Sequence, residues 1–415
     1  MKRTIFGYAT LMVVALTLSG ARAVSAQEWG QWRGAARDGV VKNFAAPAVW
    51  PKELKRLWKV PTGGGYSSPL VSAGRVFLHT RQEEVEVVSA FDLTTGKTLW
   101  SKSYPAPFSK NQYAVKMGKG PNSTPVLHAG NLYTLGVGAV LSAFDAKTGE
   151  LKWRKDFSAQ IDTSKMFCGT AMSPVIEKGM LIVHVGDDRG GQVVAFDAAT
   201  GAEKWKWQGD GPGYSSPIVV DLAGARQVVT LTDRSVVGLA ADSGKLLWKM
   251  AFADEWNENI VTPVVYGKSL IVSGIRQGTR AFEVVNTAAG YEAKQLWHNP
   301  QVSMYMSSPV LDGDYLYGLS SQRKGQYFCL DARTGQIVWA TDGREGNQAA
   351  VLSAGGVLLF LTADADLIVA ARSRKGFEPL ARYRVADAAT WAHPAVFGKQ
   401  ILVKDEAALS LWSVE

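Results

Sequence analysis

The chain has 415 residues, of which 45 are Lys or Arg and 37 are Asp or Glu, so its formal net charge is +8. The basic and acidic residues are interspersed, and loss of Lys2, Arg3 and Arg22 with the leader described next leaves a mild charge of +5. This balance argues against nucleic acid as the main partner.

Residues 1–26 have the form of a secretory signal peptide. Lys2 and Arg3 form a basic start, residues 5–18 are mostly apolar, and Val24-Ser25-Ala26 is a small-residue cleavage site, so the mature chain would begin at Gln27. A single membrane anchor is the alternative, but the apolar run is short for a span. No Cys stands at the end of the segment, which argues against a lipid-anchored mature N-terminus. We therefore expect a periplasmic or secreted protein with no stable membrane span after cleavage.

Residues 27–53 form a lead-in that differs from the rest of the chain. It carries Trp29, Trp32, Arg33-Gly34, Arg37-Asp38-Gly39 and Trp50. We expect this segment to pack across the surface of the domain that follows, which spans residues 54–415. No linker or low-complexity segment divides that domain.

Residues 54–415 are built of repeats. The pattern Asp-x-x-Thr-Gly-x-x-x-Trp is complete in four copies, which begin at Asp92, Asp145, Asp197 and Asp331. An apolar strand led by Pro precedes most copies, at Pro69, Pro125, Pro174, Pro217, Pro263, Pro309 and Pro394; one copy, near Val351, lacks the Pro. A period of this length means a repeat architecture. Short β-branched strands, four to a unit, predict an all-β, eight-bladed β-propeller of four-stranded antiparallel blades.

Each part of the repeat has a structural explanation in a propeller. The Asp-x-x-Thr-Gly run is a tight turn between the third and fourth strands, with its Gly in the left-handed region. The Trp lies on the outermost strand, where it fills the gap between diverging blades, so packing explains it without catalysis. The residues assigned to this framework are Trp58, Asp92, Gly96, Trp100, Asp145, Gly149, Trp153, Asp197, Gly201, Trp205, Gly244, Trp248, Trp297, Asp331, Gly335 and Trp339.

The two ends of the chain are expected to form the last blade together. The eighth copy stops after the strand at 408–412, without an outermost strand. Residues 54–60 have the form of that missing strand and include Trp58. Pairing of the N-terminal strand with the C-terminal sheet would leave no open sheet edge in the ring.

The Ala-x-Asp-x-x-Thr-Gly-x-x-x-Trp form at 90–100, 143–153 and 195–205 resembles the pyrroloquinoline-quinone (PQQ)-type propeller repeat, over nearly the whole mature chain. That family includes quinoprotein alcohol and glucose dehydrogenases, and also the non-enzymatic propeller lipoprotein of the outer-membrane β-barrel assembly machinery. The lead-in resembles that of exported bacterial propellers of unassigned function. The resemblance implies the fold, but the repeat is a scaffold and implies no activity.

The dehydrogenase members imply a vicinal disulfide, a Ca²⁺ ion held by carboxylate and amide oxygens, and an Asp base. Cys168 and Cys329 are far apart, and we expect two separate buried thiols. Glu258-Asn259, with Asp254 and Glu255 upstream, is the nearest Ca²⁺ candidate; a solvated acidic loop is the alternative. No haem-attachment motif or Gly-x-Ser-x-Gly is present, and His79, His128, His184, His298 and His393 lack chelating spacing. We assign no catalytic residue, metal site or cofactor; PQQ with Ca²⁺ is the alternative.

One face of the ring offers a candidate site. The loops leading into the inner strands carry Tyr66, Asn122, Cys168, Tyr214, Asn259, Tyr305, Gln348 and Trp391. The loops after the second strands carry Arg81, Arg189, Arg234, Arg276 and Arg323. Both sets belong to the same face, so they predict a basic, aromatic-lined funnel for an anionic small molecule or an acidic protein surface. Solvated turn charge, balanced by Glu83, Asp187, Asp188 and Asp233, is the alternative.

Three functions remain open from the sequence. The first is a non-catalytic scaffold that binds a protein partner through this face, in cell-envelope assembly or as an accessory to another exported protein. The second is a PQQ-dependent dehydrogenase with a divergent site, since an arginine-rich funnel suits the three carboxylates of the quinone. The third is recognition of an acidic polysaccharide, with Tyr66, Tyr214, Tyr305 and Trp391 as stacking surfaces.

Overall fold

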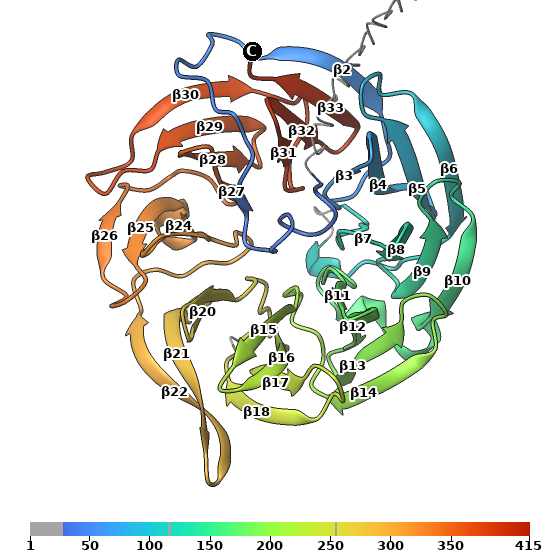
Figure 1. The fold of residues 1–415 in the computed structure, drawn as a ribbon, viewed down its shortest axis with the longest axis vertical. Coiled ribbons are helices and arrows are strands. Elements are labelled where there is room, and N and C mark those ends of the chain that lie inside the picture. Colours follow the sequence, from blue (N-terminus) through green and yellow to red (C-terminus); the bar gives the residue numbers. More distant parts are fainter. Residues whose placement is uncertain (1–27, 115–117, 254) are drawn as a thin grey trace, which may run out of the picture.

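The computed structural model describes residues 28–114, 118–253 and 255–415, so the leader and Asp254 lie outside the described residues. Eight sheets stand around a central axis like the blades of a propeller (Figure 1). The predicted all-β, eight-bladed fold is confirmed. Helical structure in the described part of the chain is limited to short 3-10 turns: η1 (Gln112–Ala114), η2 (Ser158–Gln160), η3 (Thr163–Lys165) and η4 (Gln322–Lys324).

Each blade runs from an inner strand at the axis to an outer strand at the rim. The first four blades are β3 (Leu70–Ser72), β4 (Arg75–Gln82), β5 (Val85–Asp92) and β6 (Thr98–Pro105); β7 (Val126–His128), β8 (Asn131–Leu135), β9 (Val140–Asp145) and β10 (Leu151–Asp156); β11 (Val175–Glu177), β12 (Met180–Asp187), β13 (Gly190–Asp197) and β14 (Glu203–Gly209); and β15 (Ile218–Leu222), β16 (Ala225–Leu231), β17 (Ser235–Ala240) and β18 (Leu246–Ala251).

The remaining blades follow the same order. They are β19 (Val264–Tyr266), β20 (Ser269–Gly274), β21 (Gly278–Thr287) and β22 (Gly290–Asn299); β23 (Val310–Asp312), β24 (Tyr315–Ser320), β25 (Gln326–Asp331) and β26 (Ile337–Ala340); β27 (Ala349–Ala354), β28 (Val357–Thr362), β29 (Asp366–Ala371) and β30 (Pro379–Arg384); and β31 (Ala395–Phe397), β32 (Gln400–Lys404), β33 (Ala408–Ser413) and β2 (Lys55–Pro61).

The ring closes with strands from both ends of the chain, as predicted. β2 pairs antiparallel with β33, and Trp58 stands opposite Leu411. The lead-in adds a strand that the sequence did not indicate. β1 (Val40–Val41) pairs in parallel with the inner strand β27, so the seventh blade has five strands. The N-terminal region therefore contributes to the ring at its rim and at its axis.

The repeat motif forms the predicted turn. The Oδ1 atom of Asp92 accepts hydrogen bonds from the Thr95 N–H at 2.8 Å and from the Thr95 hydroxyl at 2.7 Å. Gly96 follows with a φ of +70°, in the left-handed region that favours glycine. Asp145 and Asp197 make the same contacts in the second and third blades. The Asp carboxylate thus supplies an acceptor for N–H groups that a sharp turn would leave without a hydrogen bond.

The Trp of one blade packs on the motif Gly of the next blade. Trp100 donates its indole N–H to the Ala146 carbonyl at 3.2 Å, and a Cβ on Gly149 would lie 2.6 Å from the Trp100 ring. A β-bulge between Ala90 and Phe91 turns the outer strand so that the indole faces the neighbouring blade. Trp100 therefore packs between two blades, and Gly149 is needed for close approach as well as for its φ.

The fourth blade departs from this pattern because the fifth blade has a different outer hairpin. Trp248 donates to the side-chain oxygen of Gln227 at 2.6 Å and lies against Gly238, both in its own blade. β21 and β22 are longer than their counterparts, and their hairpin projects beyond the ring (Figure 1). The motif turn that would receive Trp248 is therefore absent from its usual place in the fifth blade.

Candidate functional site

Six of the predicted loop residues meet at the central channel. Tyr66, Asn122, Cys168, Tyr214, Gln348 and Trp391 line one cavity of about 140 Å³. The rings of Tyr66 and Trp391 lie 5.5 Å apart. The Tyr66 hydroxyl accepts the Gly118 N–H at 2.7 Å, and the Tyr214 hydroxyl accepts the Phe167 N–H at 2.7 Å, so neighbouring loops hold both rings in place. The cavity is smaller than the roughly 300–1,000 Å³ of most ligand sites.

The lead-in closes this channel from the opposite side. It crosses the centre of the ring in the foreground of Figure 1. Trp32 lines the cavity, donates its indole N–H to the Thr262 hydroxyl at 3.1 Å, and lies 4.5 Å from the His393 ring. Arg33 and Arg37 are buried, and they donate to backbone carbonyls before the inner strands of the sixth and third blades. Trp32 and the two arginines therefore pack across the end of the channel that lies opposite the loops.

Titratable groups at the channel are held in their neutral forms. Cys168 and Cys329 are free thiols, and burial raises the pKa of Cys168 to about 12. A thiol with this pKa is a poor nucleophile near neutral pH. Burial, together with nearby Arg33, holds the pKa of His393 well below its usual value. Both side chains are therefore uncharged near neutral pH.

The predicted rim arginines lie outside the channel cavity. Arg81, Arg189 and Arg323 have surroundings that differ from one another. Arg81 is buried and donates to the Glu84 carboxylate at 3.0 Å and to two backbone carbonyls. Arg189 is bound by the Asp187 carboxylate. Arg323 is exposed, in a left-handed conformation within η4. Two of these three charges are therefore compensated within their own loop.

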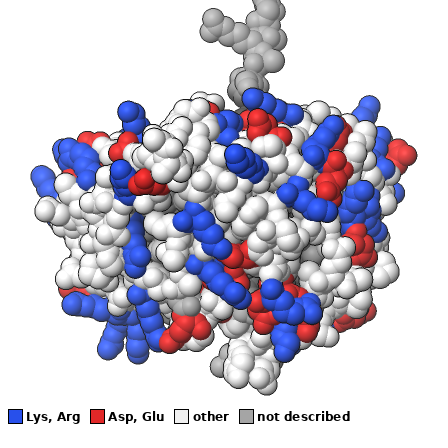
Figure 2. Space-filling view, turned by 90° about the horizontal axis from the view of Figure 1, so that it is seen from below, with Lys and Arg blue, Asp and Glu red and all other residues white. Residues whose placement is uncertain are grey.

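The other two arginines are also compensated nearby. Arg234 forms an ion pair with Asp233 at 3.3 Å and donates to the Asp188 carbonyl at 3.0 Å. Arg276 pairs with Glu255 and lies over the Trp256 ring, 4.6 Å from its centroid. Seen from its edge, the ring likewise has Lys and Arg mixed with Asp and Glu (Figure 2). Anion binding at the rim remains a prediction, since four of the five arginines already have acceptor partners.

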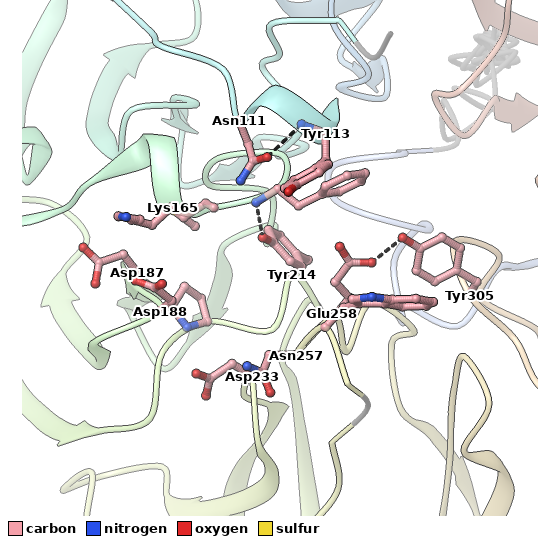
Figure 3. Close-up of a pocket in the computed structure, with 14 residues that line it drawn as sticks. Asn111, Tyr113, Lys165, Asp187, Asp188, Tyr214, Asp233, Asn257, Glu258 and Tyr305 are labelled. Carbon is pink, nitrogen blue, oxygen red and sulfur yellow. Dashed lines mark hydrogen bonds between the residues drawn. The ribbon is translucent and has the colours of Figure 1, made fainter. Parts of the chain in front are cut away.

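A larger hollow, which we name the loop-face groove, opens beside the channel (Figure 3). Its volume is about 670 Å³, and it shares Phe167 and Tyr214 with the channel cavity. Its aromatic lining also includes Tyr113, Trp256 and Tyr305. Of the described residues, the charged ones that line it are Asp187, Asp188, Asp233, Glu258 and the base Lys165. The groove is thus aromatic and predominantly acidic.

The carboxylates of the groove differ in their electrostatic state. A hydrogen bond from Arg189 lowers the pKa of Asp187 to about 2, so this group stays ionised. Glu258 is 7% exposed and accepts a hydrogen bond from the Tyr305 hydroxyl (Figure 3). Burial raises the pKa of Asp233 to about 6. One wall of the groove therefore carries a carboxyl group that titrates close to neutral pH.

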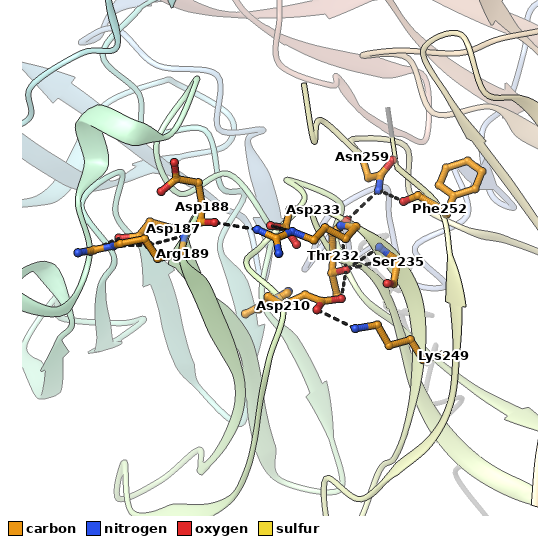
Figure 4. A network of polar contacts seen from close by, with 12 residues as sticks. Asp187, Asp188, Arg189, Asp210, Thr232, Asp233, Ser235, Lys249, Phe252 and Asn259 are labelled. Atoms are coloured by element: carbon orange, nitrogen blue, oxygen red, sulfur yellow. Dashed lines mark hydrogen bonds and ion pairs between the residues drawn. The ribbon is translucent and has the colours of Figure 1, made fainter. Parts of the chain in front are cut away.

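Asp233 stands beside a polar network that fixes the groove wall (Figure 4). The Asp210 carboxylate accepts from Lys249 at 2.7 Å and from the Thr232 hydroxyl at 3.0 Å. Asn259 donates its side-chain amide to the Thr232 carbonyl at 2.8 Å and to the Phe252 carbonyl at 2.5 Å. Asn259 therefore braces the loop before the fifth blade, and it does not line the groove or the channel cavity.

The residues present do not suit PQQ with Ca²⁺. Among the residues that the structure describes, the lining of the channel cavity contains no Arg or Lys to pair with three carboxylates, and no Asp or Glu to bind a cation. Ca²⁺ requires six to eight oxygen ligands. The described residues contain no group of three or more His, Cys, Asp and Glu that could hold a metal ion. Glu258 contacts Tyr305 instead, and Asp254 lies outside the described residues.

Sequence reasoning identified the channel residues but missed most of the groove. Tyr214, Tyr305, Asp187 and Asp233 were noted, whereas Asn111, Tyr113, Phe167 and Trp256 were not. The length of the loops is the sequence feature that could have indicated these groove residues. The segments 106–125 and 157–174 are the longest connections between blades, and they bring Asn111, Tyr113 and Phe167 to the groove. Long loops on a rigid scaffold commonly carry function.

Comparison with known proteins gives the family of this chain. A family model described as outer membrane protein assembly factor BamB matches residues 48–108 and 84–341. An outer membrane protein assembly factor BamB of Shewanella oneidensis is 25% identical over 296 residues, which are 68% of this chain and 71% of the relative. No helix in the described part of the chain is long and apolar enough to cross a membrane.

Solved structures show the same fold in a BamB protein and in an alcohol dehydrogenase. BamB from Moraxella catarrhalis has a TM-score of 0.63 at 14% identity, covering 87% of this chain and 97% of that one. A quinohemoprotein alcohol dehydrogenase from Comamonas testosteroni has a TM-score of 0.67 at 16% identity, covering 95% and 82%. These likenesses show the fold alone. The family match spans well over half of the chain, which therefore belongs to the PQQ_2 family, described as outer membrane protein assembly factor BamB.

Proposed function

We propose that this protein is a non-catalytic scaffold of the bacterial cell envelope that binds a protein partner during outer-membrane assembly. The loop face around the central channel is the binding surface. Membership of a family described by outer-membrane assembly supports the envelope role. The loop-face groove is the observation that carries the assignment to this face.

The groove has the composition of a protein-binding surface. Trp256 is 48% exposed and Tyr113 is 80% exposed, and both line it. Exposed aromatic side chains beside a hollow are typical anchors of protein interfaces. The blades beneath are fixed by sheet pairing and by the docked Trp residues, so the groove is presented on a rigid support. The neutral Cys168 and His393 at the channel also favour binding over catalysis.

Site-specific crosslinking in growing cells tests this proposal. A photoreactive aromatic residue at position 256 or 113 should give one discrete crosslinked product of an outer-membrane assembly component. The matched control is position 296, an exposed Leu on β22 at the outer rim. Equal crosslinking at position 296, or none at positions 256 and 113, would contradict the proposal.

Export and catalysis need separate measurements. We propose that residues 1–26 are removed on export, so mass spectrometry of the periplasmic fraction should find a mature N-terminus at Gln27. The purified protein, supplied with PQQ and Ca²⁺, should not reduce an acceptor dye with alcohols or sugars. Turnover in that assay would replace the scaffold proposal with the dehydrogenase alternative.

A further inference from the structure

We propose that the loop-face groove binds an organic cation, a primary ammonium or guanidinium group, with Glu258 and Asp233 as its counter-charges and Trp256 and Tyr305 as aromatic walls. This inference deepens the proposed function by giving the chemistry of the partner segment, and it rests on that function for the partner's identity. The same chemistry is found in a basic peptide and in a free polyamine, and the experiment below distinguishes them.

The charge of the groove selects a cation. Its lining has four acidic residues against Lys165. Asp187 pairs with Arg189, and Glu258 and Asp233 are the other buried acids that line the hollow. An anionic ligand would meet two carboxylates that are shielded from water, where like-charge repulsion is strong. A cation would instead gain charge-assisted hydrogen bonds.

Asp233 supplies an independent sign that a partner is missing. It is 4% exposed and lines the groove, yet neither of its carboxylate oxygens has a hydrogen bond to the described part of the chain. Its nearest cation is the Arg234 Nε atom, 3.3 Å away, in an ion pair without hydrogen-bond geometry. Buried carboxylates are almost always hydrogen-bonded, so this group calls for an N–H donor. An ammonium or guanidinium group provides several.

The aromatic walls suit the same ligand. Trp256 already accepts one cation, because the Arg276 guanidinium lies 4.6 Å from its ring centroid. Tyr305 adds a second ring beside Glu258, to which its hydroxyl donates (Figure 3). Cations over aromatic faces, next to a carboxylate, are held by cation–π attraction together with the ion pair. Aliphatic stems of Lys or Arg also pack well on such rings.

Cation affinity should depend on pH. Burial raises the pKa of Asp233 to about 6, against the opposing effects of Arg234 and Lys249 and with a contribution from Asp210. A bound cation favours the ionised form, so affinity should be highest above pH 7 and should decline as Asp233 is protonated below pH 6. Lys and Arg side chains stay charged across this range.

The experiment is calorimetric titration of the mature protein with three probes. They are a short peptide rich in Lys and Arg, its neutral norleucine–citrulline analogue, and spermidine. The basic peptide should bind, and the neutral analogue should bind at least tenfold more weakly. Binding of spermidine as well as the peptide extends the site to free amines; binding of the peptide alone identifies a protein segment. Equal binding of the neutral analogue, or no binding of either cation at millimolar concentration, overturns the proposal.

Variants locate the site. Glu258→Gln and Trp256→Ala should each weaken peptide binding roughly tenfold. Trp256 is half-exposed, so its replacement keeps the test valid if the Glu258 variant folds poorly. The matched control is Asp221→Asn, an exposed carboxylate paired with Arg226 at the turn from β15 to β16, at the blade end opposite the loop face. A control loss equal to that of the groove variants would contradict the site.

The outcome is separable from the proposed function. A protein that crosslinks to its partner at position 256 but binds neither cation would retain the scaffold role and lose the cation site. A protein that binds the basic peptide but yields no crosslinked partner would keep the cation site and lose the scaffold role.

Discussion

Replacing Gly244 by Ala tests whether the contact between Trp and Gly of adjacent blades stabilises the ring. Gly244 has a φ of +70°, and a Cβ placed there would lie 2.4 Å from the Trp205 ring. Trp205 is 7% exposed and donates its indole N–H to the Ala241 carbonyl at 3.1 Å. The new methyl group would therefore force the indole away from both its packing surface and its acceptor.

The expected cost has two parts that can be measured separately. Placing Ala in the left-handed region costs about 1 kcal/mol. Displacing a packed side chain costs a further ~1–3 kcal/mol, so Gly244→Ala should lower the free energy of unfolding by about 2–4 kcal/mol. Gly74 has a φ of +72° and nothing within 4 Å of its would-be Cβ. Gly74→Ala should consequently cost only the first part, about 1 kcal/mol.

The assay is urea unfolding of the two Ala variants, of Trp205→Ala, and of the double variant at positions 205 and 244. Trp205→Ala alone should cost about 3–5 kcal/mol. Once the indole is gone, Gly244→Ala should cost no more than Gly74→Ala, which gives a coupling energy of about 1–3 kcal/mol. If Gly244→Ala were no worse than Gly74→Ala, or equally costly without Trp205, the docking contact would carry no energy and our account of blade packing would be wrong.

Three further outcomes follow from other parts of the ring. Asp233→Asn should raise the free energy of unfolding by up to ~2 kcal/mol at pH 7.5 and leave it unchanged at pH 4. The reason is that burial raises the pKa of Asp233 from 3.8 to about 6, so that its ionised form, present above pH 6, opposes folding. Urea unfolding midpoints at both pH values check this, and equal shifts at the two pH values would contradict it. Glu86 is buried; desolvation alone would raise its pKa, but His79, Tyr104 and the Val137 N–H outweigh it and lower the pKa. Glu86→Gln should cost about 2 kcal/mol at pH 7, and progressively less as pH falls below 4.5 and the wild-type carboxylate is protonated; a constant difference would argue against the ionised form. Deleting residues 28–61 should expose the β33 edge and cause self-association in size-exclusion chromatography, whereas deleting 28–50 keeps β2 and should cause less self-association.

The repeat could be read from the sequence because its signals are local. The Asp, Thr and Gly of each motif act within one turn, and the period of the strands sets the blade. Closure by 54–60 was predictable for a similar reason: the missing strand and its Trp58 have the same form as their counterparts in other blades. The Trp248 exception was not predictable, because it depends on the shape of the neighbouring blade.

The sequence by itself determined the number of blades, the order of the strands and the face on which the inner-strand loops meet. Only the tertiary structure decided which partners the arginines find in other loops, because Arg276 pairs with Glu255 and Arg234 donates to the Asp188 carbonyl of the preceding blade. It also decided that Trp32 closes the channel and that the long loops build an acidic, aromatic groove beside it. The physical reason is range: sheet pairing and turns follow from neighbouring residues, whereas the fit between loops depends on distances that only the closed ring sets.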